Sequence, residues 1–201
     1  MNAEIDITNV VLETPRLILR EWNEDDLDDL FEYASVPEVG EMAGWKHHET
    51  KKDSQWILDR FIQGKHTFAL VFKENGKTIG SLGIDKYGME ETLTEFNDCR
   101  GREIGYVLSK GYWGNGLMAE AVKAVIDYCF QTLDLDFLLC GHYDKNARSC
   151  RVQEKCGFLP YRKLVFDTQI GTKEPGVLRL LVNPAKKIAF SFSHPETLLV
   201  K

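Results

Sequence analysis

The chain has 201 residues, of which 43% are hydrophobic, and it carries a formal net charge of -6 at pH 7. This size and composition predict one globular domain over 1–201, with a core at about 11–184 and a C-terminal tail at 185–201. The acidic balance excludes a general nucleic-acid-binding protein and favours a cationic substrate such as an amine.

Hydrophobic periodicity and turn residues predict alternating strands and helices. Asn23 is a capping residue ahead of a helix with an acidic first turn, and the Asn75-Gly76 pair is typical of a hairpin turn. In chain order, we expect a strand at 16–22, helices at 24–34 and 52–61, strands at 66–72, 77–87 and 102–109, a helix at 117–132, a strand at 136–143, a helix at 146–157 and strands at 158–166 and 178–182.

The segment 36–50 is too irregular for a helix or strand. It contains two glycines, an aromatic residue and two adjacent histidines. Because such loops often line pockets, we expect Met42, Trp45 and His48 to contact a substrate.

Several other kinds of site are not expected. The five cysteines form no C-x-x-C pair, which predicts reduced structural thiols. The histidines lack the spacing of metal ligands, so we expect no metal. No apolar run approaches the ~20 residues that cross a bilayer, and the N-terminus lacks a secretory pattern, so we expect a cytoplasmic protein without a membrane partner.

The stretch 109–120, SKGYWGNGLMAE, places three glycines between an expected strand and an expected helix. Such a turn directs backbone N–H groups and the positive end of the helix dipole at one point, which suits a phosphate or pyrophosphate. Glycine lets the backbone approach the ligand and adopt positive φ. A plain tight turn explains the same glycines, and this stretch alone leaves both interpretations open.

Two nucleotide-binding fingerprints fit this stretch poorly. The P-loop fails because no Lys and hydroxyl residue follow a glycine at the required spacing. Gly114, Gly116 and Ala119 match the dinucleotide turn on paper, but SKGYW separates the strand from the first glycine and Asp144 comes too late for the ribose contact.

The combined segments resemble the GNAT superfamily of acyl-CoA-dependent N-acyltransferases, and more closely its RimJ/RimL-like branch. TPRLILREW is similar to that branch's first strand, and EMAGW before QWI is similar to its first-helix region. EIGYVLSKGYWGNGLMAEA resembles the signature strand, pyrophosphate loop and helix, and NARSCRVQEKCGF resembles the Asn-x-x-Ser helix that ends in Gly-Phe. These segments span residues 14–182 in the family's order.

The resemblance implies an α+β fold with three α/β layers, in which helices flank a mixed, mostly antiparallel sheet of six to seven strands. Two splayed strands would form the cleft for acetyl-CoA, the acyl donor, with its pyrophosphate on the N–H groups of 111–116 and its pantetheine beside 106–109. The implied cofactor contacts are Tyr106, Val107, Leu108, Ser109, Gly111, Tyr112, Trp113, Gly114, Asn115, Gly116, Leu117, Met118, Asn146 and Ser149. Trp113 either covers the cofactor or packs under the turn, and Asn146 has helix capping as its alternative role.

Three positions depart from the family's pattern. Gly111 stands where the loop usually begins with Gln or Arg, and Lys110 replaces a frequent proline, so a side-chain contact to the phosphates is lost. Gln153 occupies the position of the tyrosine that acts as general acid in many members, and that role therefore does not transfer.

Candidate catalytic residues follow from the chemistry of amine acylation. The acceptor must lose a proton, and Glu103, on the same strand face as 105 and 107, can hold a water that accepts it. Its alternative is a surface acid paired with Arg100 or Arg102. The backbone N–H of Tyr106 or Val107 is the oxyanion donor that the resemblance implies, and Ser149 is the candidate proton donor to the leaving thiolate, with a structural hydroxyl as the alternative.

We therefore predict a transfer of the acetyl group to a primary amine, on a protein N-terminus or a small molecule, by direct attack in a ternary complex. A non-catalytic acyl-CoA-binding module and a dinucleotide-binding oxidoreductase are the competing hypotheses. The expected partner is the amine-bearing acceptor, and the expected state is a monomer or homodimer.

Overall fold

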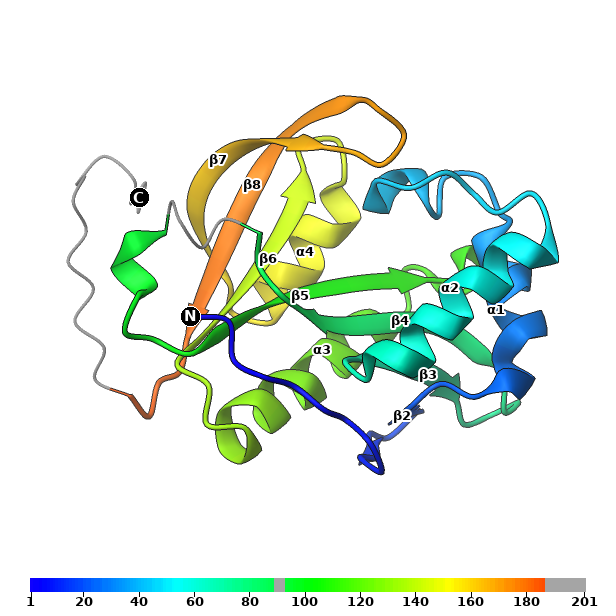
Figure 1. The fold of residues 1–201 in the computed structure, drawn as a ribbon, viewed down its shortest axis with the longest axis horizontal. Coiled ribbons are helices and arrows are strands. Elements are labelled where there is room, and N and C mark those ends of the chain that lie inside the picture. Colours follow the sequence, from blue (N-terminus) through cyan, green and yellow to red (C-terminus); the bar gives the residue numbers. More distant parts are fainter. Residues whose placement is uncertain (89–92, 187–201) are drawn as a thin grey trace.

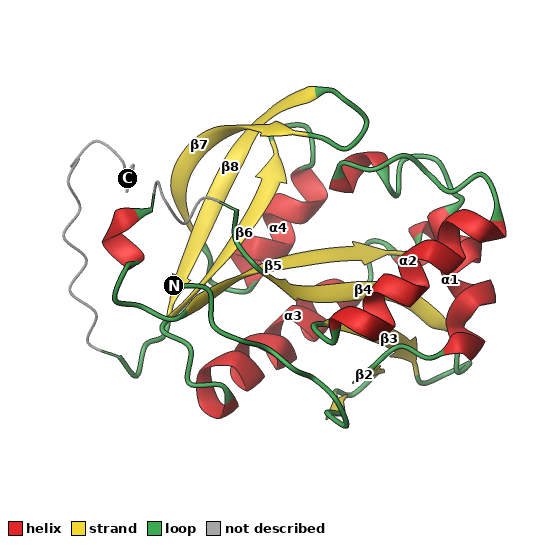
Figure 2. Ribbon diagram, in the orientation of Figure 1, coloured by secondary structure: helices red, strands yellow, loops and turns green. Residues whose placement is uncertain are grey.

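A computed structural model describes residues 1–88 and 93–186, which form one twisted sheet flanked by helices (Figures 1 and 2). The strands are β1 (Leu12–Glu13), β2 (Leu17–Arg20), β3 (Thr67–Phe72), β4 (Thr78–Asp85), β5 (Gly101–Leu108), β6 (Phe137–Tyr143), β7 (Leu159–Asp167) and β8 (Lys173–Val182). Their order in the sheet is β1-β2-β3-β4-β5-β6-β8-β7, and β5 with β6 is the parallel pair among antiparallel neighbours. The predicted mixed, mostly antiparallel sheet is confirmed, with eight strands in the described residues where we expected six or seven.

The helices are α1 (Leu27–Ala34), α2 (Lys51–Gly64), α3 (Leu117–Asp127) and α4 (Ala147–Lys155), and α3 continues as a π-helical turn over Tyr128–Thr132. Asn23 caps the turn Glu24–Asp26 ahead of α1, as predicted, through a capping box with Asp26. Thr50 and Asp53 form a second capping box at α2, which is longer at both ends than the predicted 52–61. None of the described helices is long and apolar enough to span a membrane.

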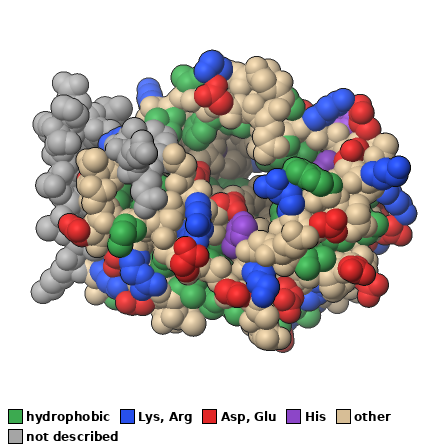
Figure 3. Space-filling view, viewed as in Figure 1, with side chains coloured by type: hydrophobic (Ala, Val, Ile, Leu, Met, Phe, Trp, Pro, Cys, Tyr) green, Lys and Arg blue, Asp and Glu red, His purple; other side chains and the backbone are tan. Residues whose placement is uncertain are grey.

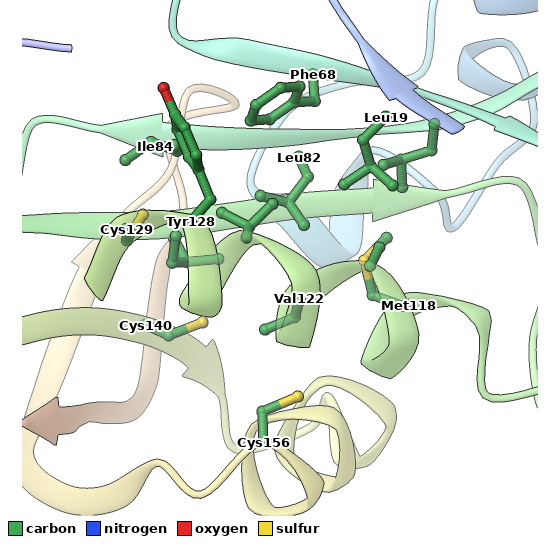
Figure 4. Packing of buried hydrophobic residues seen from close by; sticks show 14 of the residues in the cluster. Leu19, Phe68, Leu82, Ile84, Met118, Val122, Tyr128, Cys129, Cys140 and Cys156 are labelled. Atoms are coloured by element: carbon green, nitrogen blue, oxygen red, sulfur yellow. The ribbon is translucent and has the colours of Figure 1, made fainter. Parts of the chain in front are cut away.

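Alternation along the strands distributes the side chains between hydrophobic clusters on opposite faces of the sheet. On β3, Phe68 and Leu70 face the larger core with α3, while Ala69 faces the smaller core with α1 and α2. Figure 4 shows α3, with Met118 and Val122, beneath the strands that carry Leu82 and Phe68; all four side chains belong to the larger core. The core therefore fixes α3, and with it the glycine turn, against the middle of the sheet.

The sheet divides at its centre. β5 and β6 pair only from Gly101 with Phe137 to Glu103 with Leu139. Beyond Glu103, β5 continues against β4, and β6 continues against β8. An opening between the two strands results, visible in Figure 1 as the divergence of β5 from β6.

Two further predictions concern the C-terminal tail and the cysteines. The tail predicted at 185–201 lies outside the described residues from 187 onward. All five cysteines are free thiols, in agreement with the sequence.

Candidate active site

A cavity of about 610 Å³ occupies the opening between β5 and β6. Its walls come from both strands, the glycine turn with the start of α3, one side of α4, and the segment after α1. Figure 3 shows the surface hollowed in this region, with a histidine and acidic side chains at the lower rim. The cavity thus connects the face that carries α3 and α4 to the face that carries α1 and α2.

The glycine turn is held rigidly at one end of the cavity. Gly114 and Gly116 have φ of 83° and 77°, in the left-handed region that favours glycine. Trp113 Nε1 donates to the Leu108 carbonyl oxygen at 2.7 Å, and Arg16 donates to the Asn115 carbonyl oxygen at 3.0 Å. These bonds fix the turn so that the N–H groups that begin α3 stay available to a ligand.

Cationic side chains of α4 face the same end. Arg148, Arg151 and Lys155 line the cavity, and the Arg148 guanidinium lies 4.2 Å from the Trp113 ring centroid. Trp113 therefore packs under the turn and lines the cavity at once. Sequence reasoning missed these three cations, although their spacing places them on one side of the predicted helix. Together with the helix N-terminus, they make this end suited to phosphates.

The exposed edge of β5 presents backbone groups to the cavity. The Ser109 N–H donates to the Ile79 carbonyl oxygen at 2.7 Å, which fixes the alternation of the β4–β5 ladder. Two residues earlier, Val107 lies opposite Ser81 and directs its backbone groups to β4. The N–H and C=O of Tyr106 therefore point to the cleft, and of the two predicted oxyanion donors only Tyr106 has an N–H in position.

Glu103 is half-buried where β5 and β6 part. No described residue forms a hydrogen bond or ion pair with its side chain, and the predicted alternative of a pair with Arg100 or Arg102 does not occur. Arg102 instead donates to the Ala3 carbonyl oxygen at 2.5 Å. Burial, and secondarily the charge of Asp85, raise the pKa of Glu103 to about 7. The carboxyl group is thus balanced between its two protonation states near neutral pH.

A second polar cluster lies on the α4 side of the cleft. Gln153 is fully buried and donates through Nε2 to the Gly141 carbonyl oxygen at 2.9 Å. Its Oε1 must then accept the 2.7 Å bond from His142 Nδ1, which fixes that imidazole as the Nδ1–H tautomer when neutral. Burial lowers the pKa of His142 and favours this neutral form. The glutamine therefore organises the cluster from the position where a tyrosine was expected.

Ser149 lies at the centre of this cluster. Its Oγ is 2.8 Å from Tyr106 Oη and 3.3 Å from Gln153 Nε2. Burial raises the pKa of Tyr106 well above its usual range, so the phenol stays protonated. The Asn146 side chain also accepts from the Ser149 N–H at 3.1 Å, and its amide donates to the Met42 carbonyl oxygen at 3.2 Å. Asn146 therefore caps α4 and ties the helix to the segment after α1.

Most of the predicted site residues meet in the cavity, and some do not. Ser109, Gly111 and Asn115 are absent from its lining: Ser109 bonds to β4, and Asn115 turns its amide to the Tyr112 carbonyl oxygen. The predicted residues in the lining are Glu103, Tyr106, Val107, Leu108, Tyr112, Trp113, Gly114, Gly116, Leu117, Met118, Asn146, Ser149 and Met42.

Two predicted substrate contacts also lie elsewhere. His48 is 8% exposed, its Nδ1 is 2.7 Å from Ser54 Oγ, and its N–H donates to the Ala34 carbonyl oxygen at 2.9 Å. The Trp45 ring packs on the His48 imidazole, with ring centroids 5.1 Å apart. Both side chains are engaged in holding the loop against α1 and α2, which the loop's composition did not reveal.

Away from the cations and the polar cluster around Ser149, the lining of the cavity is mainly apolar. Val39, Met42, Ala43, Tyr143 and Phe166 line it, and Glu103 is the only acidic residue in the lining that the described chain supplies. Acidic side chains near the rim already have partners: Glu38 with Lys110 at 3.0 Å, Glu41 with His47 at 2.8 Å and Glu174 with Lys145 at 2.7 Å. The cavity thus offers one uncompensated carboxyl group to a ligand beside its apolar walls.

Comparison with known proteins agrees with this geometry. Residues 16–159 match the family described as the acetyltransferase (GNAT) domain. The chain is 31% identical, over 152 residues, to an uncharacterized N-acetyltransferase, p20, of Bacillus licheniformis, a match that covers 73% of this chain and 81% of the relative.

Solved structures show the same fold. A GNAT-family acetyltransferase from Bacillus anthracis has a TM-score of 0.74 at 20% identity, covering 87% of this chain and 99% of that one. A spermidine N-acetyltransferase from Vibrio cholerae, in complex with CoA and spermine, has a TM-score of 0.67 at 16% identity, covering 85% and 97% of the two chains.

Proposed function

Because the chain belongs to the GNAT family of acetyltransferases and is an N-acetyltransferase, we propose that it moves an acetyl group from acetyl-CoA to a primary amine by direct attack in a ternary complex. One observation carries this proposal. A single cavity joins a phosphate-suited end, made by the glycine turn and the cations of α4, to an uncompensated carboxyl group beside apolar walls. Donor and acceptor can therefore approach each other from the two faces of the sheet.

The donor binds with its phosphates at the start of α3 and its pantetheine arm along the exposed edge of β5. The N–H groups that begin the helix and the side chains of Arg148, Arg151 and Lys155 would neutralise the phosphates. The cleft-facing N–H and C=O of Tyr106 would bond the amides of the arm or the thioester oxygen. The thioester then lies where β5 and β6 part, near Glu103.

Glu103 takes the proton of the acceptor in this proposal, directly or through a water. An alkylammonium ion has a pKa near ~10.4 and an α-ammonium ion ~7.7 to 8.0, so the attacking amine must be deprotonated in the site. A base with a pKa of about 7 is charged in half of the molecules at that pH and still holds a proton firmly. The attack leaves an oxyanion, for which the Tyr106 N–H is the available donor.

Ser149 would protonate or hydrogen-bond the leaving thiolate. Tyr106 Oη and Gln153 Nε2 can both donate to Ser149 Oγ, which leaves the serine proton free to point into the cleft. A thiol has a pKa near ~8.5, so a hydrogen bond without full transfer already helps the sulfur to leave. Gln153 thereby positions Ser149 and does not itself take the role of the missing tyrosine.

The acceptor that fits the cavity is an amine with one positive charge beside an apolar group. Glu103 provides the only uncompensated carboxyl group in the described lining, and Met42 and Phe166 provide apolar walls. A polyamine would place its further charges against these walls, at a desolvation cost without a compensating anion. A protein N-terminus with a small or apolar first residue meets the requirement, consistent with the RimJ/RimL-like segments of the sequence.

An acetylation assay tests the proposal. The protein is incubated with acetyl-CoA and each of a panel of amines: peptides with Ala, Ser or Met N-termini, an arylalkylamine, spermidine and an aminoglycoside. Released CoA thiol and the mass of the product are measured, with Glu103→Gln as the matched control of strongly reduced activity. We expect transfer to at least one apolar monoamine. Acetyl-CoA binding without transfer to any amine would support the non-catalytic module instead, and stabilisation by NAD or NADP without CoA would support the oxidoreductase.

A further inference from the structure

The face of the sheet that carries Glu103 holds a second carboxylate outside the cavity lining. Asp85 ends β4 and lies directly opposite Glu103 in the register of β4 with β5. Opposed residues of an antiparallel pair share a face, with Cα atoms about 5.5 Å apart where the backbones exchange hydrogen bonds. The two carboxyl groups are therefore close neighbours where the cleft begins.

Two glycines make room for the Asp85 side chain against the sheet. A Cβ atom on Gly83 would lie 2.6 Å from Asp85 Oδ2, and a Cβ atom on Gly105 would lie 2.9 Å from the same oxygen. Gly83 and Gly105 are themselves opposed across β4 and β5. Larger residues here would displace the carboxylate, so the glycines keep its charge beside Glu103.

His66, the residue immediately before β3, pairs with this carboxylate. Its Nε2 lies 3.3 Å from Asp85 Oδ1, and its Nδ1 lies 2.6 Å from the Gly64 carbonyl oxygen. Because a carbonyl oxygen only accepts, Nδ1 carries a proton, and the bond to an ionised carboxylate requires a second proton on Nε2. The hydrogen bond to Asp85, the Gly64 carbonyl and the Asp85 charge raise the pKa of His66 against burial and Arg102, which lower it. His66 is therefore an imidazolium ion that pairs with the Asp85 carboxylate.

We propose that Asp85 and His66 are positioning residues for the general base: Asp85 makes Glu103 hold its proton more tightly, and His66 limits this effect by compensating the Asp85 charge. The inference rests on the acetyl transfer proposed above. An anion beside Glu103 disfavours its charged form, while an imidazolium one step further away favours it. The pair would therefore set the pH at which the base becomes available to the acceptor.

Among the described residues, the other titratable groups near this pair lie on β5, β6 and the flanking segments. Arg102 lies on β5 and acts on His66, and Cys140 on β6 is kept protonated by burial. Phe166 of β7, which is uncharged, packs beside Gly141 near Glu103. The remaining neighbours in sequence are in ion pairs of their own: Lys65 with Asp6 at 3.9 Å and Lys86 with Glu4 at 3.7 Å.

Two substitutions of opposite sign test the inference. Asp85→Asn removes the negative charge with little change of shape, and His66→Gln removes the positive charge while keeping a donor for Asp85. In the pH profile of kcat/KM for acetylation, we expect the acidic limb to move about 0.5 to 1 pH unit down in Asp85→Asn and a similar amount up in His66→Gln. The His66→Gln shift should vanish when Asp85→Asn is also present.

The matched control is Asp28→Asn, which removes a carboxylate from a surface ion pair with Lys51 at 2.7 Å and should leave the limb in place. A second readout needs no turnover: the ¹³C NMR titration of the Glu103 carboxyl group, assigned with Glu103→Gln, in wild type and in both variants. Opposite shifts in the profile and in the titration support the inference. A merely structural role would lower kcat or stability without moving either.

The failure of this inference is distinct from the failure of the proposed function. Active variants whose acidic limb and carboxyl titration both stay in place would overturn the roles of Asp85 and His66 and leave acetyl transfer standing. Opposite carboxyl shifts in a protein that acetylates no amine would refute the proposed function, and with it the positioning of a catalytic base, while retaining the charge coupling itself.

Discussion

Substitution of Gly116 by alanine tests whether the glycine turn is a backbone cradle for phosphate. Gly116 precedes α3 with φ of 77°, and the nearest atom that an added Cβ would meet is Arg16 at 3.8 Å. Steric room is therefore not the obstacle, and the cost arises from the backbone conformation. A left-handed non-glycine residue costs about 1 to 2 kcal/mol, which predicts a fall in Tm of about 2 to 8 °C for a domain of this size.

The effect on acetyl-CoA should exceed this loss of stability. If the backbone relaxes from positive φ, the N–H groups at the start of α3 turn away from the phosphates. Loss of one hydrogen bond to a charged group costs about 1.5 to 3 kcal/mol, so the Kd for acetyl-CoA should rise about 10- to 100-fold. Calorimetric titration of acetyl-CoA into the variant measures this change.

Gly76 provides the matched control. It lies in the β3–β4 turn with φ of 73°, and an added Cβ would meet no atom within 4 Å. Gly76→Ala should therefore lower Tm by a similar amount and leave acetyl-CoA affinity unchanged. Equal affinities of the two variants, at equal loss of Tm, would refute the cradle.

Three further predictions concern the cleft. Glu103→Gln should lower kcat about 10²-fold or more and remove the acidic limb that we expect near pH 7 in wild type, since only the charged base accepts a proton; an unchanged profile would place the base elsewhere. A raised folded-state pKa means that Glu103 destabilises the fold increasingly as pH rises from about 4.5 through 7, so Glu103→Gln should unfold at a higher temperature than wild type at pH 8 and at the same temperature at pH 4. Ser149→Ala should lower kcat more than it raises the KM for acetyl-CoA, and Gln153→Leu should have the same effect but a smaller one. If only the KM changes, both residues have structural roles and do not act in the transfer step.

Most regular elements could be predicted from the sequence because their local signals agree with their tertiary contacts. The hairpin at Asn75-Gly76, the cap at Asn23 and the helix after the glycine turn all occur where predicted. β1 is only two residues long and has no periodicity to read. The start of β8 was missed because Pro175 and Gly176 argue against a strand.

Gly176 occurs inside β8 because the neighbouring strand approaches its backbone closely. A Cβ atom on Gly176 would lie 2.2 Å from the His142 carbonyl oxygen of the neighbouring β6. Glycine is therefore required within this strand, although it weakens the strand signal in the sequence. The need for glycine at 176 depends on the pairing of β6 with β8, which the sequence alone does not show.

The parts of the candidate site that a contiguous motif forms occur where the sequence predicts them. The glycine turn precedes α3 with Gly114 and Gly116 at positive φ, and Glu103 lies on the predicted strand beside the cavity. The bonds of Gln153 to His142 and of His66 to Asp85 depend on the register of separate elements, which a single sequence does not specify. His48 was predicted to contact a substrate because it lies in an irregular loop, but in the structure its side chain is bonded to Ser54 of α2.

The measurement that tests the central claim most directly is thermal unfolding of the wild-type protein with acetyl-CoA, CoA, NAD, NADP or ATP. A ligand at 100 times its Kd stabilises the folded state by about 2.7 kcal/mol, or roughly 5 to 10 °C for a chain of this length. We predict this shift with acetyl-CoA and CoA and none with the other three. No shift with either CoA species, or a larger one with a dinucleotide, would contradict the assignment of the β5–β6 cleft to acetyl-CoA.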